Sequence, residues 1–530
     1  MLSERTIING LLLLGGMILG PYLIIFTLET NQIALLSFCG LVFLFSVFFF
    51  VKDRIAIFPV IGGYFTGTLN FLPLGFTLVE VFSLVAILYY AINYIVLKRR
   101  PVSTGPRHIL LPILVLAAIV LYHDHQVGLK VLGGASEGSR PGLLILVAIV
   151  AYFCGINIPS PSTTFLRRVP FYCFIVTLVS SAPFILTTYF PSLAPFVYYI
   201  SGNVNLDAYA SSVEGTDLSD FSRNGALAGI GASLTTVLVC YFPISTWWHP
   251  KRWIFILLTA VSFVFVLFSG YRNTLFGFLM ILLLCSICYS RLRVFVLLPM
   301  LAILPFAVVI IQNDHPYGLE VPLNVQRSMS FLPGDWDDNV IQSKASSNGF
   351  RDDINKVYEH EYLAKSPWLG NGFTFDPSEP EGLANMANIP GASDKAYYLT
   401  KAFIVSKNFH TGWISLYDAV GIVGGIAFIW LYVCLVWIGG RLVFEASEDT
   451  RSQIFPLKVF TFANLVIGLI GYFTTFGSFG ISMVSICGYA VVLVHILKIE
   501  SQQRSPAVSP SPQTALMPTR QEAFAPMQKL

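Results

Sequence analysis

Charged side chains are scarce in this chain. Asp, Glu, Lys and Arg together make up 12% of the 530 residues, whereas hydrophobic residues make up 55%. The share of charge in a soluble globular domain is about twice as large. The mean hydropathy of +0.70 points the same way. The composition therefore excludes a soluble protein of this length and predicts an all-α polytopic membrane protein.

Familiar cofactor motifs are also absent from the sequence, which has no P-loop, no dinucleotide fingerprint and no H-E-x-x-H zinc motif. All eight cysteines lie in apolar runs, so we expect no disulfide framework. Cys285 and Cys288 form a C-x-x-C without a His or acidic partner in their helix, which favours packing over a metal or redox site. The H-D-H run at 123–125 leaves a metal site open but favours a solvated helix end. We expect neither a metal nor another cofactor.

Long apolar stretches recur along almost the whole chain. A membrane span needs about 20 mostly apolar residues. The stretches that meet this length are 7–28, 32–51, 55–74, 76–97, 108–123, 142–158, 170–190, 224–244, 252–270, 273–290, 293–312, 410–438, 457–477 and 479–497. The first lacks a small-residue cleavage site and is interpreted as a retained helix rather than a signal peptide. We therefore expect about 12–14 transmembrane helices.

These stretches divide the chain into five parts. N-terminal membrane helices (1–220) and central membrane helices (221–312) precede one large loop (313–409), which C-terminal membrane helices (410–498) follow. The tail (499–530) is rich in Ser, Pro and Gln, which predicts disorder.

Basic residues mark one side of the predicted membrane. With a cytoplasmic N-terminus, every second loop is basic, and cytoplasmic loops carry an excess of Lys and Arg. The inside residues are then Lys52, Arg54, Lys98, Arg99, Arg100, Arg107, Arg167, Arg168, Lys251, Arg252, Arg291, Arg293, Arg441, Arg451, Lys458, Lys498 and Arg504. Both termini are expected in the cytoplasm, and the large loop outside.

The large loop has a pattern of its own. Residues 352–365 predict a short helix with an apolar face, 366–373 predict turns, and 395–407 predict a second helix along the membrane surface. A loop of this length without a function is unusual.

Four residues that can carry chemistry fall on the outer side: Arg223, Arg272, Arg351 and His410. Arg327 is a fifth candidate. An interfacial arginine often only snorkels to lipid headgroups, which is the favoured reading for Arg223 alone. Arg272 favours function, because its turn is short and Gly270 allows close backbone approach. The planar guanidinium donates two parallel hydrogen bonds to phosphate oxygens.

His410 stands where the large loop ends and the next span begins. An imidazole near its ordinary pKa can accept a proton from a sugar hydroxyl at neutral pH. A capping or packed histidine is an equally good interpretation of the residue taken alone.

The spacing around His410 resembles the H-x10-G element of the O-antigen ligase and O-antigen polymerase superfamily. Ten residues separate His410 from Gly421, with Asp418 before that glycine and Gly424 after it. Three further stretches agree in order: R-N-G-A-L-A at 223–228, S-G-Y-R at 269–272, and Arg351 followed by P-W-L-G-N-G-F at 367–373. The resemblance covers about 220–435.

The resemblance implies a GT-C-like membrane glycosyltransferase of polysaccharide or lipopolysaccharide biosynthesis in the bacterial inner membrane. Its donor is a glycan on undecaprenyl diphosphate, and its acceptor a second glycan or a lipid A core. Arg272 and Arg351 are implied to hold the leaving diphosphate, and His410 to orient or deprotonate the acceptor hydroxyl. Arg223, Arg327, Gly270 and Tyr271 are expected to help bind substrate. A chain-length regulator or a flippase is the expected protein partner, and no nucleic acid is expected.

Two other functions stay open. A polytopic transporter of glycan or another anionic solute predicts charges within the spans and a helix repeat, and the sequence shows neither clearly. A scaffolding protein leaves the long loop and its arginines unexplained.

Overall fold

The computed structural model describes residues 52–70, 76–96, 105–127, 140–205, 223–247, 249–289, 294–314, 320–373, 378–387, 394–407, 409, 411–445, 454–474 and 478–504. Within these ranges the chain is almost entirely helical, and its only β pairing is a single bridge between Thr68 and Thr77. The all-α prediction is confirmed for this part of the chain. The predicted spans 7–28 and 32–51 and the tail after residue 504 lie outside it.

Eight helices of the described ranges are long and apolar enough to cross a membrane. They are α5 (Arg107–Val127), α6 (Arg140–Asn157), α7 (Thr163–Tyr189), α11 (Trp253–Phe268), α12 (Arg272–Tyr289), α18 (Gly412–Phe444), α20 (Phe455–Thr474) and α21 (Phe479–Arg504). Each falls on a predicted span. The arrangement is compatible with a multi-pass membrane protein, whereas the total of 12–14 spans stays a prediction.

The predicted span 55–74 is wrong as a continuous helix. The chain forms a 3-10 helix, η1 (Lys52–Ile57), and the five-residue α3 (Phe58–Gly62), and then runs without regular structure to residue 70. Glycines and a proline in this stretch favour such an interruption. The predicted span 76–97 is instead α4 (Leu78–Tyr90) continued by the π-helix η3 (Ala91–Val96).

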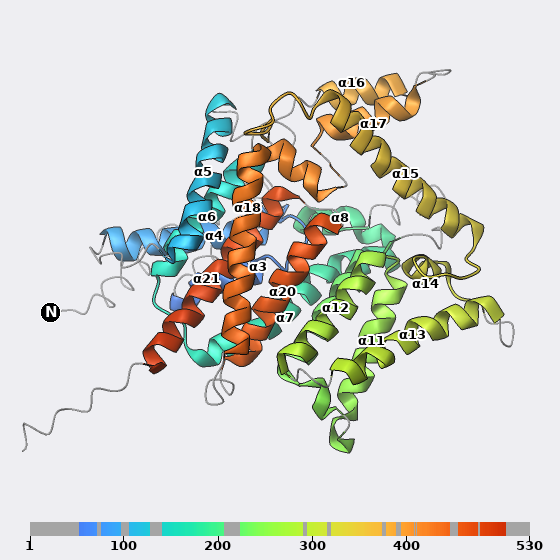
Figure 1. Ribbon diagram of the computed structural model, residues 1–530, viewed down its shortest axis with the longest axis horizontal. Helices are drawn as coiled ribbons and strands as arrows, with labels where there is room; N and C mark the ends of the chain where they lie inside the picture. Colours follow the sequence, from blue (N-terminus) through green and yellow to red (C-terminus); the bar gives the residue numbers. More distant parts are fainter. Residues whose placement is uncertain are drawn as a thin grey trace, which may run out of the picture.

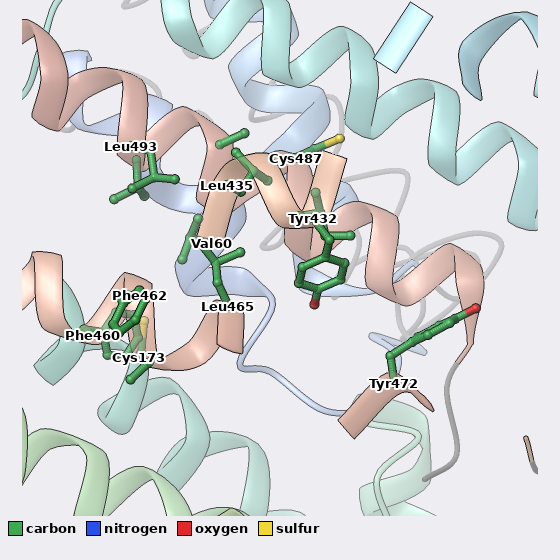
Figure 2. Close-up of a cluster of buried hydrophobic side chains, with 14 of the residues drawn as sticks. Val60, Cys173, Tyr432, Leu435, Phe460, Phe462, Leu465, Tyr472, Cys487 and Leu493 are labelled. Carbon is green, nitrogen blue, oxygen red and sulfur yellow. The ribbon is translucent and has the colours of Figure 1, made fainter. Parts of the chain in front are cut away.

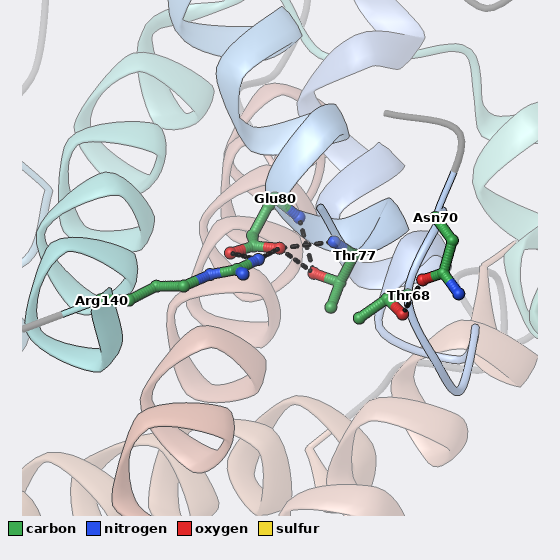
Figure 3. Close-up of polar contacts among 5 residues, drawn as sticks. All are labelled: Thr68, Asn70, Thr77, Glu80 and Arg140. Atoms are coloured by element: carbon green, nitrogen blue, oxygen red, sulfur yellow. Dashed lines mark hydrogen bonds and ion pairs between the residues drawn. The ribbon is translucent and has the colours of Figure 1, made fainter. Parts of the chain in front are cut away.

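A polar cluster fixes the start of α4. Thr77 and Glu80 form a capping box, in which each side chain bonds the other residue's backbone N–H. Arg140, at the start of α6, makes an ion pair of 3.2 Å with the Glu80 carboxylate (Figure 3). The pair explains why a carboxylate is tolerated at the start of an apolar helix, because buried charges require partners.

Further helices connect these elements. They are η5 (Pro191–Leu193), α8 (Ala194–Ile200), α10 (Gly225–Tyr241), η6 (Ile244–Thr246), η7 (Pro250–Arg252) and α13 (Val294–Asp314). α10 is apolar and packs against α7, α11 and α12.

Four helices of the predicted large loop form what we call the cap: α14 (Leu323–Met329), α15 (Asp338–Glu361), α16 (Ser378–Ala387) and α17 (Lys395–Val405), with their connections. α15, α16 and α17 gather beyond one end of the membrane helices, at the top of Figure 1. The helix predicted at 352–365 is, as far as Glu361, the second half of the longer α15. The helix predicted at 395–407 is confirmed as α17, and its place along the membrane surface stays a prediction. The sequence patterns did not predict α14 and α16.

The main core joins the C-terminal helices to earlier segments. Tyr432 and Leu435 of α18 lie with Phe460 and Leu465 of α20 and Cys487 of α21 in one buried cluster (Figure 2). α18 also packs along α5, and α21 along α6. This packing places the start of α18 next to the cap.

Candidate functional site

The start of α10 and the turn before α12 are held together by backbone hydrogen bonds. The N–H of Asn224 donates to the carbonyl of Ser269 at 3.0 Å, and the Asn224 side chain caps α10 by accepting from the N–H of Leu227. Gly270 follows with φ +72°, a conformation suited to glycine. Its missing Cβ would lie 3.9 Å from the Cα of Arg223. The turn therefore brings Arg223 beside Arg272.

Tyr271 directly precedes Arg272 in the sequence, and its aromatic ring lies against Arg223. The guanidinium of Arg223 stands over the ring of Tyr271, 5.5 Å from its centre. Such a contact stabilises a cation on the ring face without neutralising it. Arg223 therefore stays available to bind an anion.

α14 brings a third arginine to the same place. The Ser328 hydroxyl donates to the carbonyl of Leu267 at 2.8 Å, which fixes α14 against the end of α11. The Asn324 Oδ1 lies 3.7 Å from the position of a Cβ on Gly270 and is buried, with no hydrogen-bond partner among the described residues. Burial first, and then the charges of Arg223 and Arg272, lower the pKa of Arg327 to about 10. The guanidinium remains charged at neutral pH.

Arg351 of α15 completes the group. Its positive charge, together with that of Arg223, acts on the guanidinium of Arg272, which is partly buried at the start of α12. Arg272 therefore stands at the centre of what we call the arginine cluster: Arg223, Arg272, Arg327 and Arg351. Arg272 and Arg351, which the resemblance implies to act together, are thus close enough for their charges to interact.

Among the described residues, no carboxylate forms an ion pair with Arg223, Arg272 or Arg351. Like charges gathered in a partly buried place repel each other, and an anion offsets that repulsion. A phosphate or diphosphate group matches the forked donors of arginine. The arrangement can therefore bind a phosphate-bearing substrate.

His410 lies outside the described residues, so its predicted role remains a prediction. Its described neighbours are well fixed. Phe409 is buried against the ring of Tyr358 on α15, with ring centres 5.7 Å apart. The carbonyl of Thr411 accepts the first backbone hydrogen bond of α18, from the N–H of Ser415. Both ends of this short stretch are thus anchored at the boundary of cap and membrane helices.

The predicted P-x-L-G-x-G-x-F element packs into an interruption of α18. Gly421 has φ +63° and ψ −164°, which breaks the helix. The N–H groups of Ile422 and Val423 are thereby released and donate to the carbonyls of Pro367 and Trp368, at 2.9 and 3.1 Å. The glycine of the H-x10-G spacing thus forms a joint between the cap and the membrane helices. The two motifs are separate in the sequence, and only the fold brings them together.

The sequence offers two candidate metal sites, the Cys285–Cys288 pair and the H-D-H run at 123–125, and the structure describes the residues of both. No group of three or more His, Cys, Asp or Glu in the described residues is arranged to hold a metal ion. Cys285 and Cys288 are buried free thiols. His123, of the H-D-H run, directs Nε2 to the Leu369 carbonyl at 2.8 Å, and its ring fills the space beside Gly372. His123 is therefore a buried packing partner of the 366–373 turn, and the expectation of a solvated helix end is wrong for this residue.

A cavity of about 380 Å³ lies on the cap near α14. Its lining residues are Gln312, Glu320, Gln326, Asp335, Trp336, Asp337 and Asp338. Four carboxylates would repel a diphosphate. This cavity is therefore distinct in charge from the arginine cluster, although Gln326 and Arg327 are adjacent on α14.

Comparison of the chain with known protein families and with curated proteins finds no match. The class that the structure defines is a helical protein with eight described helices able to span a membrane and a helical cap at one end.

Proposed function

We propose that this chain is a membrane glycosyltransferase that transfers or polymerises a glycan carried on undecaprenyl diphosphate. The observation that carries the proposal is the arginine cluster: Arg272 interacts with the charges of Arg223 and Arg351, and none of these three pairs with a described carboxylate. The order of the motifs, which resembles that of the O-antigen ligase and polymerase superfamily, is the second support.

The chemistry explains why such a cluster suits this reaction. Breaking the bond between an anomeric carbon and the diphosphate oxygen develops negative charge on the leaving group. Cations placed beforehand at that position stabilise the transition state more than the ground state. Arg272 and Arg351 take this role, Arg223 and Arg327 assist in binding, and Tyr271 and Gly270 shape the turn. His410 orients or deprotonates the acceptor hydroxyl.

We also propose where the reaction takes place and which acceptors it uses. The cap lies on the outer side of the bacterial cytoplasmic membrane, the fold is GT-C-like, and both termini are cytoplasmic. Catalysis proceeds without a metal ion. The acceptor is a second lipid-linked glycan, which makes the protein a polymerase, or a lipid A core, which makes it a ligase.

Substitution of the three central residues tests the enzyme proposal. Arg272→Ala, Arg351→Ala and His410→Ala should each abolish surface polysaccharide assembly while the protein still accumulates in the membrane. Normal assembly by all three variants would contradict the proposal. The length of lipid-linked glycans in a deletion strain then separates the two classes. Single repeats should accumulate without a polymerase, and long chains without a ligase.

A transporter of an anionic glycan is the second candidate, and one observation favours it. Between α3 and α4 the chain leaves helical structure, and Thr66 there bonds Ser180 of α7 through both backbone and side chain. Interrupted segments of this kind form substrate sites in many transporters. Purified protein in vesicles separates the candidates, because an enzyme releases undecaprenyl diphosphate and a transporter only moves the intact donor.

A further inference from the structure

One buried carboxylate collects contacts from three segments of the cap. Asp418 lies just before the break in α18 and is only 2% exposed. Its Oδ2 accepts from the Lys407 Nζ at 2.6 Å. Its Oδ1 accepts from the Asn371 Nδ2 at 2.8 Å and from the Tyr358 hydroxyl at 3.2 Å. Its backbone carbonyl also accepts from the N–H of Asn371. Asp418 thus joins α15, the 366–373 turn and the end of α17 to α18.

The ion pair with Lys407 makes this arrangement dependent on charge. A carboxylate removed from water stays ionised only with a counter-charge and hydrogen-bond donors around it. Lys407 supplies the counter-charge, and it does so from a backbone with φ +58°, which residues other than glycine rarely adopt. The loss of either partner therefore leaves a buried charge or a strained turn without support.

Tyr358 carries the effect of Asp418 to the arginine cluster. It lies seven residues after Arg351 on α15, which is two helical turns, so the two side chains share one face. Tyr358 is fully buried in a small core with Ile354, Phe409 and Ile414. The contact of Tyr358 with α18 therefore restrains α15 both along its axis and in rotation about that axis, and Arg351 is restrained with it.

Arg351 needs this restraint because the residues around it are also positively charged. Its charge acts on Arg272, which is already next to Arg223. Like charges push α15 away from α12 until an anion is bound. The attachment at Asp418 opposes that movement.

We propose that Asp418 is a positioning residue for Arg351: through Tyr358, and balanced by Lys407, it holds Arg351 in the arginine cluster before the substrate arrives. The proposal rests on the proposed function, since it assumes that the cluster binds the diphosphate of the donor. Asp418 itself does not touch substrate.

A double-mutant cycle tests this positioning role. The full-length protein is purified in detergent, and its affinity for a short-chain polyprenyl diphosphate is measured with and without Arg351→Ala. Lys407→Met, which leaves the Asp418 charge buried alone, should weaken binding about tenfold when Arg351 is present. In the Arg351→Ala background the same change should have an effect of less than about twofold, because the group it positions is gone.

Charge balance supplies a rescue. The double variant Lys407→Met/Asp418→Asn carries no unpaired buried charge and keeps an oxygen for Tyr358 and Asn371. It should recover most of the affinity lost in Lys407→Met. Tyr358→Phe keeps the ring in the core and removes only the hydroxyl, so it tests the same link if Lys407→Met does not fold. Its expected loss is about threefold, again only with Arg351 present.

Lys401→Met is the matched control. Lys401 lies on α17, six residues before Lys407, and pairs with Glu361 of α15 at 3.0 Å, but both side chains are partly solvated. Its substitution should leave affinity unchanged. Equal weakening by Lys407→Met in both Arg351 backgrounds, or no weakening, overturns the positioning role. If the wild type binds the probe no better than Arg272→Ala does, the proposed function itself fails.

Discussion

Gly370 of the cap and Gly421 of α18 lie backbone against backbone. A Cβ on Gly370 would stand 2.7 Å from the Gly421 nitrogen, and a Cβ on Gly421 would stand 2.5 Å from the Gly370 nitrogen. Both residues also have positive φ, +80° and +63°. No other residue type satisfies both the space and the conformation at this joint. The contact explains why two motifs about 50 residues apart both contain glycine.

Gly421→Ala should therefore destabilise the protein. The strained backbone alone costs about 1–3 kcal/mol, and the added methyl group meets the backbone of the 368–370 turn, which cannot rotate away. The midpoint of thermal unfolding in detergent measures the effect. Gly425→Ala, also in α18, is the control, since its nearest contacts are ordinary ones at 3.8 Å. It should be neutral or stabilise slightly, because alanine favours helix by up to about 1 kcal/mol. Equal behaviour of the two variants would contradict the joint.

Arg272→Lys should support little surface polysaccharide assembly, although it keeps the positive charge. A lysine is a point charge and lacks the two parallel donors that match a diphosphate. A loss of assembly comparable to that of Arg272→Ala is expected, with normal amounts of protein in the membrane. The control is Arg441→Lys on α18, where the arginine pairs with Glu445 in solvent. Full activity of Arg272→Lys would show that charge alone is sufficient and would remove the argument for a forked contact.

The sequence predicted the apolar segments and the outer arginines, because hydropathy and charge are properties of single residues. It could not predict that Asp418 is buried in a network with Lys407 and Tyr358, since these partners come from distant segments. The only sequence feature that pointed to this network was a carboxylate, Asp418, close to the start of an apolar run. The break between α3 and α4 was missed because apolar length alone does not distinguish a helix from an irregular segment. His410, on which much of the motif depends, lies outside the described residues.

Lys458 of α20 and Glu500 of α21 form a deeply buried ion pair, and their separate substitutions should be costly. The Lys458 side chain is 0% exposed and donates to the Glu500 carboxylate. Lys458→Met leaves the carboxylate without its cation, a change of about 3–5 kcal/mol. The double variant Lys458→Met/Glu500→Gln removes both charges and should regain most of that stability. Protein abundance in membranes and the thermal midpoint measure both. A double variant less stable than Lys458→Met would show that the charges themselves stabilise the packing of α20 on α21.

Acid should loosen the contact between α15 and α17. The pKa of Glu361 in the folded cap is lowered, first because Tyr397 donates a hydrogen bond to its carboxylate and also because Lys401 lies beside it. A lowered pKa means that the stabilisation is complete above the ordinary glutamate pKa of about 4.3. It is lost as the pH falls through the lower value in the fold. Limited digestion with an acid-active protease between pH 5 and about pH 3 should therefore cut the α15–α17 region increasingly as the pH falls. Glu361→Gln has no such carboxylate, so its cutting should depend less on pH; an unchanged pH dependence would assign the transition to another group of the cap.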